Sequence, residues 1–396
     1  MTKIKKALVL ILSLSMIVAS LAACGTKDTK KSDDTSKDTP KGDAFVIGGI
    51  GPVTGDAAVY GQSVKNGADL AVKEINAAGG INGKQISFLF EDDEANEAKA
   101  VNAYNTLKDK GMQLLMGTVT SGACKAIIKE THADNMFQLT PSGSSADLLK
   151  YDNFFQVCFT DPNQGIASAQ YIAGNSVAKK VAVIYNSSDI YSTGIYEKFA
   201  EEAKKQNLEI VAAEAFTTES KSDFSVQIQK AKDKGAELVF LPIYYNEAAL
   251  ILKQSKDIGF KPIFFGCDGL DGILTVKNFD KTLAEGLMLL TPFAADATDD
   301  RTKNFVTSYK TAYTDTPNQF AADAYDAIYI IKAAIEKSGA KADMSVKDLG
   351  DALKGAMPQI SVDGLTGAGM TWSATGEVNK APRAIIIKDG AYVSAQ

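Results

Sequence analysis

Short apolar runs alternate with amphipathic stretches along the first third of the chain. Val64, Ala68, Ala71 and Val72 recur at helical spacing, whereas the runs between such stretches are short and continuous, as in buried strands. The pattern predicts strands at 45–50, 85–90, 114–116 and 137–139, and helices at 64–75, 95–110 and 123–135. This βαβα order predicts a parallel sheet with helices on both faces.

A second series of the same kind begins after Asp161-Pro162-Asn163. It predicts strands at 181–185, 208–213, 238–241 and 263–265, and helices at 193–205, 224–234 and 247–258. Two successive series of similar length predict two similar α/β lobes.

The last hundred residues have a different pattern. Helical spacing predicts helices at 301–313, 320–338 and 345–354, and the third opens with Ser345-x-x-Asp348 in capping-box spacing. Short β segments are predicted at 364–372 and 384–387. The pattern alone does not assign these elements to either lobe.

The N-terminus has the parts of an export signal. Three lysines at positions 3, 5 and 6 precede an uncharged apolar run at 7–21, which ends in Leu21-Ala22-Ala23-Cys24. The run is shorter than the about 20 apolar residues that span a bilayer. The cysteine resembles a bacterial lipobox, which predicts cleavage of 1–23, lipidation of Cys24 and an extracytoplasmic, lipid-anchored protein. An uncleaved N-terminal anchor is the alternative. Residues 24–43 are polar and predict a flexible tether after the lipid.

Composition restricts the function further. About 350 residues follow the tether, which is more than one core usually serves, so two domains are expected. The net charge of −6 argues against a nucleic-acid partner. His132 is the single histidine and lies in a predicted helix, so a Ser-His-Asp arrangement has no convincing base.

Cysteine usage and glycine loops argue against a metal or a nucleotide. Cys124, Cys158 and Cys267 are an odd set without CxxC spacing, which favours small buried side chains over a zinc site. Gly48-Gly49-Ile50-Gly51-Pro52 follows a predicted strand, but Thr54 stands where a dinucleotide loop needs its third glycine. Neither a metal nor a cofactor is expected.

Two hydroxyl-rich loops are candidates for anion binding. Residues 117–122 and 140–145 each follow a predicted strand and precede a helix, so they lie at carboxyl ends of strands, where open α/β sheets bind ligands. Their hydroxyl and backbone N–H groups lie near helix N-termini, which favour a negative charge. The alternative is plain helix capping by Ser121 and by Ser144 or Ser145.

The second series carries an acidic and two aromatic candidates. Asp268 follows a predicted strand and could pair with a cationic ligand group, although a turn aspartate beside Gly269 is the simpler interpretation. Tyr191 and Tyr244 also follow predicted strands. Exposed loop aromatics can form the wall of a ligand site, although they more often belong to the packing.

Several motifs together resemble one known family. They are Gly51-Pro52-Val53-Thr54-Gly55, Tyr60-Gly61, the stretch EINAAGGING at 74–83, Thr140-Pro141-Ser142 and Asp268-Gly269. Over residues 44–396 the chain resembles the type I periplasmic binding proteins of branched-chain amino acid ABC importers, the Leu/Ile/Val-binding family. The resemblance implies an α/β fold of two Rossmann-like lobes with parallel-sheet cores, joined by three crossovers in a Venus-flytrap arrangement. Lobe 1 would comprise 44–161 plus 291–372, and lobe 2 would comprise 162–290 plus 373–396.

The resemblance also implies roles for individual residues. The ligand α-carboxylate would be held by Ser121, Ser142 and Ser144, and its α-ammonium by Asp268. Tyr191 and Tyr244 would line the face of the second lobe, and Tyr60 would form a wall on the first. Asp268 is one methylene shorter than the glutamate common at this position, which leaves the side-chain preference open.

The implied function is capture of an amino acid, most simply a branched-chain or hydrophobic one, by a monomer that delivers it to an ABC permease in the membrane. No catalytic residue is implied. Three alternatives remain open: a different small ligand such as an amide, a urea-like compound or an aromatic acid, a sensory lipoprotein, or an enzyme.

Overall fold

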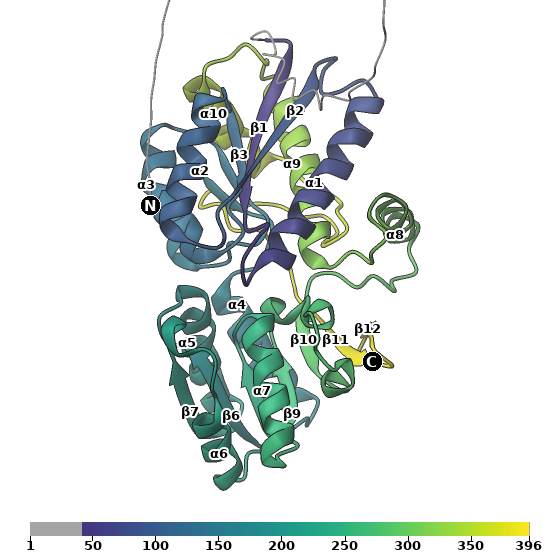
Figure 1. The fold of residues 1–396 in the computed structure, drawn as a ribbon. Coiled ribbons are helices and arrows are strands. Elements are labelled where there is room, and N and C mark those ends of the chain that lie inside the picture. Colours follow the sequence, from purple (N-terminus) through teal and green to yellow (C-terminus); the bar gives the residue numbers. More distant parts are fainter. Residues whose placement is uncertain (1–41, 396) are drawn as a thin grey trace, which may run out of the picture. The chain divides into compact units, whose positions relative to one another are not determined.

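The computed structural model describes residues 42–395, so the predicted signal segment, Cys24 and nearly all of the predicted tether lie outside the described residues. The first sheet has the strand order β2-β1-β3-β4-β5, and every neighbouring pair is parallel (Figure 1). Its strands are β1 (Ala44–Gly51), β2 (Gln85–Asp92), β3 (Leu114–Gly117), β4 (Gln138–Thr140) and β5 (Phe154–Gln156).

Helices cover both faces of the first sheet because β1 presents large apolar side chains to each. Phe45 and Ile47 pack in the core beneath α1 (Ala58–Ala77) and α9 (Gln319–Ser338). Ile50 packs in a separate core with α2 (Glu97–Asp109) and α3 (Ser121–Ala133). α1 and α9 approach closely, since a Cβ added at Gly67 would lie 2.0 Å from the carbonyl oxygen of Ala321.

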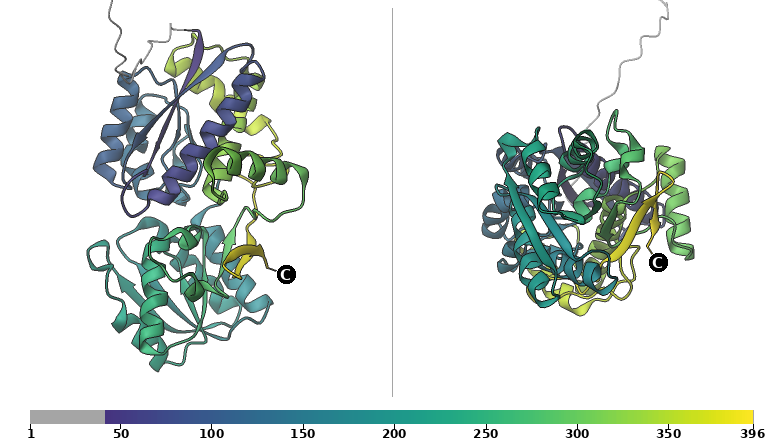
Figure 2. Two further views of the ribbon diagram at one scale, coloured as in Figure 1. Left: turned by 45° about the vertical axis from the view of Figure 1, so that its right-hand side comes forward. Right: turned by 90° about the horizontal axis from the view of Figure 1, so that it is seen from below.

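The second sheet has the order β12-β11-β10-β9-β8-β6-β7 and is parallel except at one edge. Its strands are β6 (Lys180–Asn186), β7 (Glu209–Phe216), β8 (Leu238–Leu241), β9 (Ile263–Gly266), β10 (Met288–Thr291), β11 (Arg383–Lys388) and β12 (Ala391–Ser394). Its helices are α4 (Asp161–Gly174), α5 (Ile190–Lys205), α6 (Ser225–Asp233) and α7 (Tyr245–Ile258). The antiparallel hairpin β11–β12 forms the edge, where it is yellow in Figure 2.

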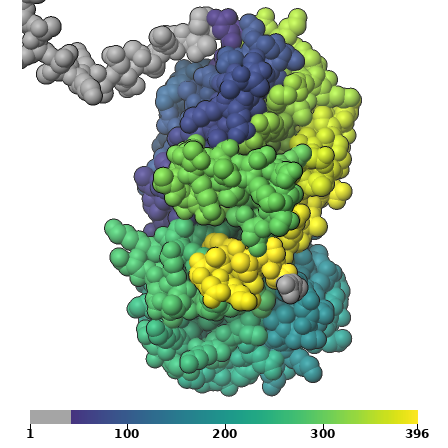
Figure 3. All heavy atoms as spheres, turned by 90° about the vertical axis from the view of Figure 1, so that its right-hand side faces the viewer, coloured from purple at the N-terminus to yellow at the C-terminus, as the bar shows by residue number. Residues whose placement is uncertain are grey.

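The chain crosses between the two sheets three times. It passes from β5 to α4 and β6, from β10 to α9, and finally from α10 (Val346–Ala356) to β11. α8 (Asp300–Tyr313) lies within the second crossing. The C-terminal residues that make the third crossing lie on the surface in Figure 3, where they are yellow. The residue bounds of the two lobes stay a prediction, but the α/β fold with two mostly parallel sheets is confirmed.

Several local expectations from the sequence differ from the structure, and the short strands β5, β10 and β12 were not predicted. The sequence pattern did not predict α4, which starts with Asp161 and has Pro162 in its first turn, where a missing N–H costs nothing. The strand predicted at 364–372 does not form, although Met370 and Trp372 make isolated antiparallel bridges to Val362 and Val378. The N–H groups of Leu365 and Thr366 donate to the carboxylate of Asp326 (2.8 and 2.9 Å), so they are not available for a strand ladder.

The three cysteines within the described residues are buried, as the sequence predicted, and the structure shows that they are free. Between residues 42 and 395, no three His, Cys, Asp or Glu side chains gather as metal ligands. No helix in this part of the chain is long and apolar enough to cross a membrane.

Candidate functional site

A small cavity lies where strand ends of both sheets meet. About 250 Å³ of space around it is not filled by atoms, open solvent included, and the cavity volume itself is about 20 Å³, room for roughly one water molecule. Six of the seven side chains that the resemblance implied lie on its wall. The lining residues are Tyr60, Val119, Thr120, Ser121, Ser142, Tyr191, Tyr244, Asp268, Gly269 and Phe320.

One end of the cavity is the N-terminus of α3. The N-cap residue Thr120 makes no side-chain cap, so the first-turn N–H groups of α3 are not used by its side chain. The Ser121 hydroxyl oxygen accepts hydrogen bonds from the backbone N–H groups of Ser144 (3.1 Å) and Ser145 (3.2 Å). Its own proton is therefore available to a ligand. This end presents donors and the positive pole of a helix, which suits an anion.

The two other predicted serines differ in position. The Ser142 hydroxyl lines the cavity and donates to the carbonyl oxygen of Val119 (2.7 Å), so toward a ligand it offers lone pairs. Ser144 is buried and does not line the cavity. Its backbone N–H donates a hydrogen bond to the Ser121 hydroxyl oxygen and so helps to fix the position of that side chain.

The opposite end of the cavity carries Asp268, in a tight turn after β9. The Tyr191 hydroxyl donates to its carboxylate (2.7 Å) and accepts from the Gly269 N–H (3.0 Å). Burial raises the pKa of Asp268 to about 7, although the hydrogen bond from Tyr191 opposes the rise. No described lysine or arginine pairs with this carboxylate, so a cationic ligand group would find a partner here.

Aromatic rings form the wall between the two ends. Tyr60 packs against Phe320 (centroids 4.3 Å apart) and edge-on against Tyr244 (5.5 Å), which in turn packs against Tyr191 (5.3 Å). The Tyr60 hydroxyl, from the first lobe, donates to the Gly269 carbonyl of the second lobe (2.5 Å). Because the Tyr60 and Tyr191 hydroxyls have protein partners, their ring faces are left to contact an apolar group.

Four lining residues were absent from the predicted site, namely Val119, Thr120, Gly269 and Phe320. Val119 and Thr120 lie in the first hydroxyl-rich loop, so the strand-end argument could have included them. Phe320 lies in the first turn of α9, after a long connection and not directly after a strand. Only the tertiary contact with Tyr60 reveals its place.

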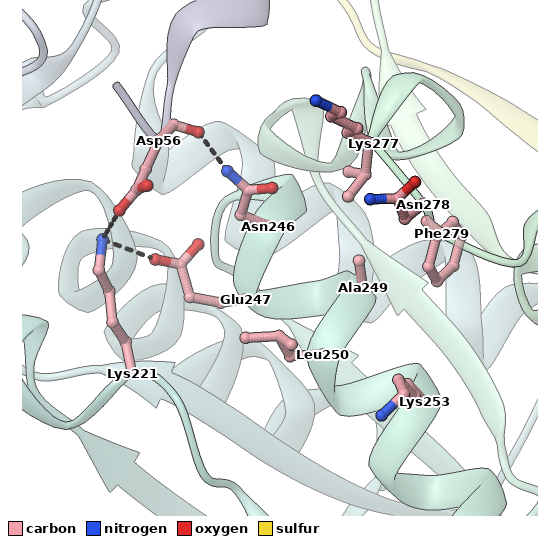
Figure 4. Close-up of a pocket in the computed structure, with 11 residues that line it drawn as sticks. Asp56, Lys221, Asn246, Glu247, Ala249, Leu250, Lys253, Lys277, Asn278 and Phe279 are labelled. Carbon is pink, nitrogen blue, oxygen red and sulfur yellow. Dashed lines mark hydrogen bonds and ion pairs between the residues drawn. The ribbon is translucent and has the colours of Figure 1, made fainter. Parts of the chain in front are cut away.

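A larger groove of about 740 Å³ lies nearby and contains none of the predicted residues (Figure 4). There the Lys221 ammonium contacts the carboxylates of Asp56 (2.7 Å) and Glu247 (3.5 Å), and the Asn246 amide donates to the Asp56 carbonyl. Asp56 belongs to the first lobe and Lys221 to the second. Such a partly exposed ion pair contributes about 0–1 kcal/mol. Both carboxylates of its lining already pair with Lys221, so this groove offers no free carboxylate to a ligand ammonium.

Comparison with known proteins agrees with this geometry. Residues 45–391 match the family model described as periplasmic binding protein. A Leu/Ile/Val-binding protein homolog of Brucella melitensis is 30% identical over 337 residues, which are 85% of this chain and 89% of the relative. A leucine-, isoleucine-, valine-, threonine- and alanine-binding protein of Pseudomonas aeruginosa is 27% identical, with 82% and 84% covered.

A solved structure agrees with the two sequence relatives. The branched-chain amino acid transporter substrate-binding protein LivJ of Streptococcus pneumoniae, in complex with isoleucine, superimposes with a TM-score of 0.81 at 29% identity, covering 89% of this chain and 99% of that one. The family match therefore extends over both lobes and the cavity between them. This chain belongs to the type I periplasmic binding proteins, in the family of the Leu/Ile/Val-binding proteins of branched-chain amino acid ABC importers.

Proposed function

We propose that this protein is the extracytoplasmic substrate-binding component of an ABC importer and captures an aliphatic amino acid in the small cavity. The observation that carries the proposal is the arrangement of that cavity, with an uncapped helix N-terminus at one end, an unpaired carboxylate at the other and aromatic rings between them. An amino-acid zwitterion has the matching charges.

Each polar group has a distinct role in this proposal. The carboxylate of the amino acid accepts hydrogen bonds from Ser121, Thr120 and the N-terminal N–H groups of α3. Its ammonium donates to Asp268. Ser142 was expected at the carboxylate end, but its proton is used by Val119, so we assign its lone pairs to the ammonium. Ser144 acts through its backbone support of Ser121.

Ligand binding favours closure of the lobes because the two charged ends contact different lobes. Ser121 follows β3 of the first sheet and Asp268 follows β9 of the second, so both contacts form fully only when the lobes are together. A ligand shifts a conformational equilibrium by its difference in affinity for the two states. The closed, loaded form then delivers its amino acid to the membrane permease.

Titration calorimetry with a panel of L-amino acids tests the proposal. At least one branched-chain member should bind tightly, and Ser121→Ala should weaken it roughly 10- to 100-fold, as expected for one lost hydrogen bond to a charged group. Ser255→Ala is the matched control, since Ser255 is a buried serine on α7 outside the cavity.

Ligands that lack the α-ammonium distinguish the alternatives. If only amides, urea-like compounds or aromatic acids bind, the amino-acid proposal is wrong. If an amino acid binds, but cells that lack the protein still take it up and lose a signalling response to it, the protein serves sensing and not import.

The lipid anchor at Cys24 is part of the same proposal and rests on the lipobox pattern. Cys24→Ser should move the protein from the membrane fraction to the soluble fraction, because one acyl-bearing terminus is lost while the folded lobes are unchanged. Fractionation of cells with an antibody against the lobes measures this. A wild-type protein whose N-terminal residue is not an acylated Cys24 by mass spectrometry would contradict the assignment of Cys24.

A further inference from the structure

We propose that Gln319 is a positioning residue that joins the Asp268 turn to the first lobe and so couples recognition of the ligand ammonium to the hinge. This inference rests on the proposed role of Asp268 in amino-acid binding. Gln319 does not line the cavity and would not contact the ligand.

The contacts of Gln319 are few and all buried. Its side-chain amide donates to the carbonyl oxygen of Asp268 (3.1 Å), and its side-chain oxygen accepts from the Thr291 hydroxyl (2.9 Å). Its backbone N–H donates to the carboxylate of Asp271 (2.8 Å). Gln319 is only 1% exposed and Thr291 is fully buried, so water cannot replace these partners.

These contacts link two parts of the molecule that hinge motion would separate. Gln319 is the first residue of α9, which packs along α1 on the first sheet, whereas Asp268 and Asp271 lie in the turn after β9 of the second sheet. Thr291 is the last residue of β10, where the second crossing begins. The hydrogen bonds of Gln319 therefore lie beside the second crossing. Through them, a movement of α9 is transmitted to the backbone of Asp268.

The Asp268 turn is also held from the side of the first crossing. Its backbone N–H donates to the side-chain oxygen of Gln164 in the first turn of α4 (3.3 Å). Tyr191 holds the carboxylate itself. Of these three contacts to Asp268 itself, only that of Gln319 comes from the first lobe, while the Tyr60 hydroxyl bonds the next residue of the turn, Gly269. Phe320, the next residue, forms part of the cavity wall, so the same turn of α9 sets the position of the ammonium partner and of an aromatic ring.

The test compares two ligands that differ only at the ammonium: the tightest-binding branched-chain amino acid and its 2-hydroxy acid analogue. In Gln319→Met, which keeps the chain length and removes the amide, the preference for the amino acid over the hydroxy acid should shrink by about tenfold. Thr291→Val removes the hydroxyl that bonds the Gln319 side-chain oxygen. It should also reduce the preference for the amino acid, but by a smaller factor.

Gln113→Met is the matched control. Gln113 is a buried glutamine of the first lobe that also bonds two backbone groups, Val46 N–H and the Ala342 carbonyl, far from Asp268 in the sequence and outside the cavity. It should lose stability but keep the wild-type ligand preference. If both Gln319→Met and Thr291→Val keep that preference, the inference is overturned. If the wild-type protein binds no amino acid, the proposed function itself fails.

Discussion

Asp268→Asn should abolish most of the affinity for the amino acid. The substitution keeps the shape of the side chain but removes the negative charge that faces the ligand ammonium. Removing one partner of a buried, hydrogen-bonded charge pair costs about 2–5 kcal/mol, which corresponds to roughly 30- to 4000-fold in Kd. Calorimetric titration of both proteins at pH 8 measures the change.

The same carboxylate should make binding by the wild-type protein depend on pH. Burial raises the pKa of Asp268 to about 7, and the neighbouring carboxylate of Asp323 adds to the rise. An ammonium binds the ionised form, so binding below pH 7 must release a proton. As pH falls from 7 to 5.5, Kd should rise by up to about tenfold per pH unit, and above pH 7 it should level off. In Asp268→Asn this dependence should disappear.

Asp93→Asn is the matched control for both effects. Asp93 is fully buried in the first lobe, burial raises its pKa to about 7, and it does not line the cavity. It should bind with the wild-type Kd and the wild-type pH dependence. Equal losses in the two variants would mean that the affinity change reflects general destabilisation, and Asp268 would lose its assigned role.

Lys380→Met should destabilise the folded protein by about 3–5 kcal/mol, the usual result when one partner of a buried ion pair is removed. The Lys380 ammonium is fully buried and contacts the Asp323 carboxylate (2.7 Å), the Val157 carbonyl (2.9 Å) and the Thr366 hydroxyl (2.6 Å). Lys380 lies in the third crossing, Val157 follows β5 at the first, and Asp323 is on α9 after the second. One cation thus joins all three crossings.

Urea denaturation at pH 8 and pH 5 measures this effect. Burial raises the pKa of Asp323 to about 6 while Lys380 opposes the rise, so without the lysine Asp323 is more readily protonated. The variant should therefore lose less stability at pH 5 than at pH 8.

Lys354→Met provides the comparison for Lys380→Met. The Lys354 side chain is 18% exposed and pairs with the exposed carboxylates of Asp152 and Asp351, so its loss should cost only about 0–1 kcal/mol. Adding Asp323→Leu to Lys380→Met should restore part of the stability, because no buried charge then remains unpaired. Two lysine variants of equal stability would contradict the buried-pair argument.

Most of the fold was predictable because most elements have a local signal. Strands such as 181–185 are continuous apolar runs, and α1 has apolar residues at helical spacing. One failure lies where a distant group overrides local preference. Residues 364–372 read as a β segment, but the carboxylate of Asp326, some 40 positions away in the chain, accepts the N–H groups of Leu365 and Thr366.

The residues of the candidate site also fall into those that the sequence could predict and those that it could not. Ser121, Ser142, Tyr191, Tyr244 and Asp268 were predictable because they stand at the carboxyl ends of strands or the starts of the helices that follow, and chain order places those ends at one sheet edge. Phe320 was not predictable, because it reaches the cavity through the packing of α9 on α1.

The sequence by itself determined the α/β class, the two series of strands and helices, the family resemblance and most of the cavity's side chains, since these depend on patterns within short segments. Only the tertiary structure decided which groups are already paired. The Ser142 proton is used by Val119, Ser144 supports Ser121 from behind, Gln319 holds the Asp268 turn, and Lys380 joins three crossings. Each of these depends on hydrogen bonds between residues far apart in the chain, whose distances no local pattern encodes.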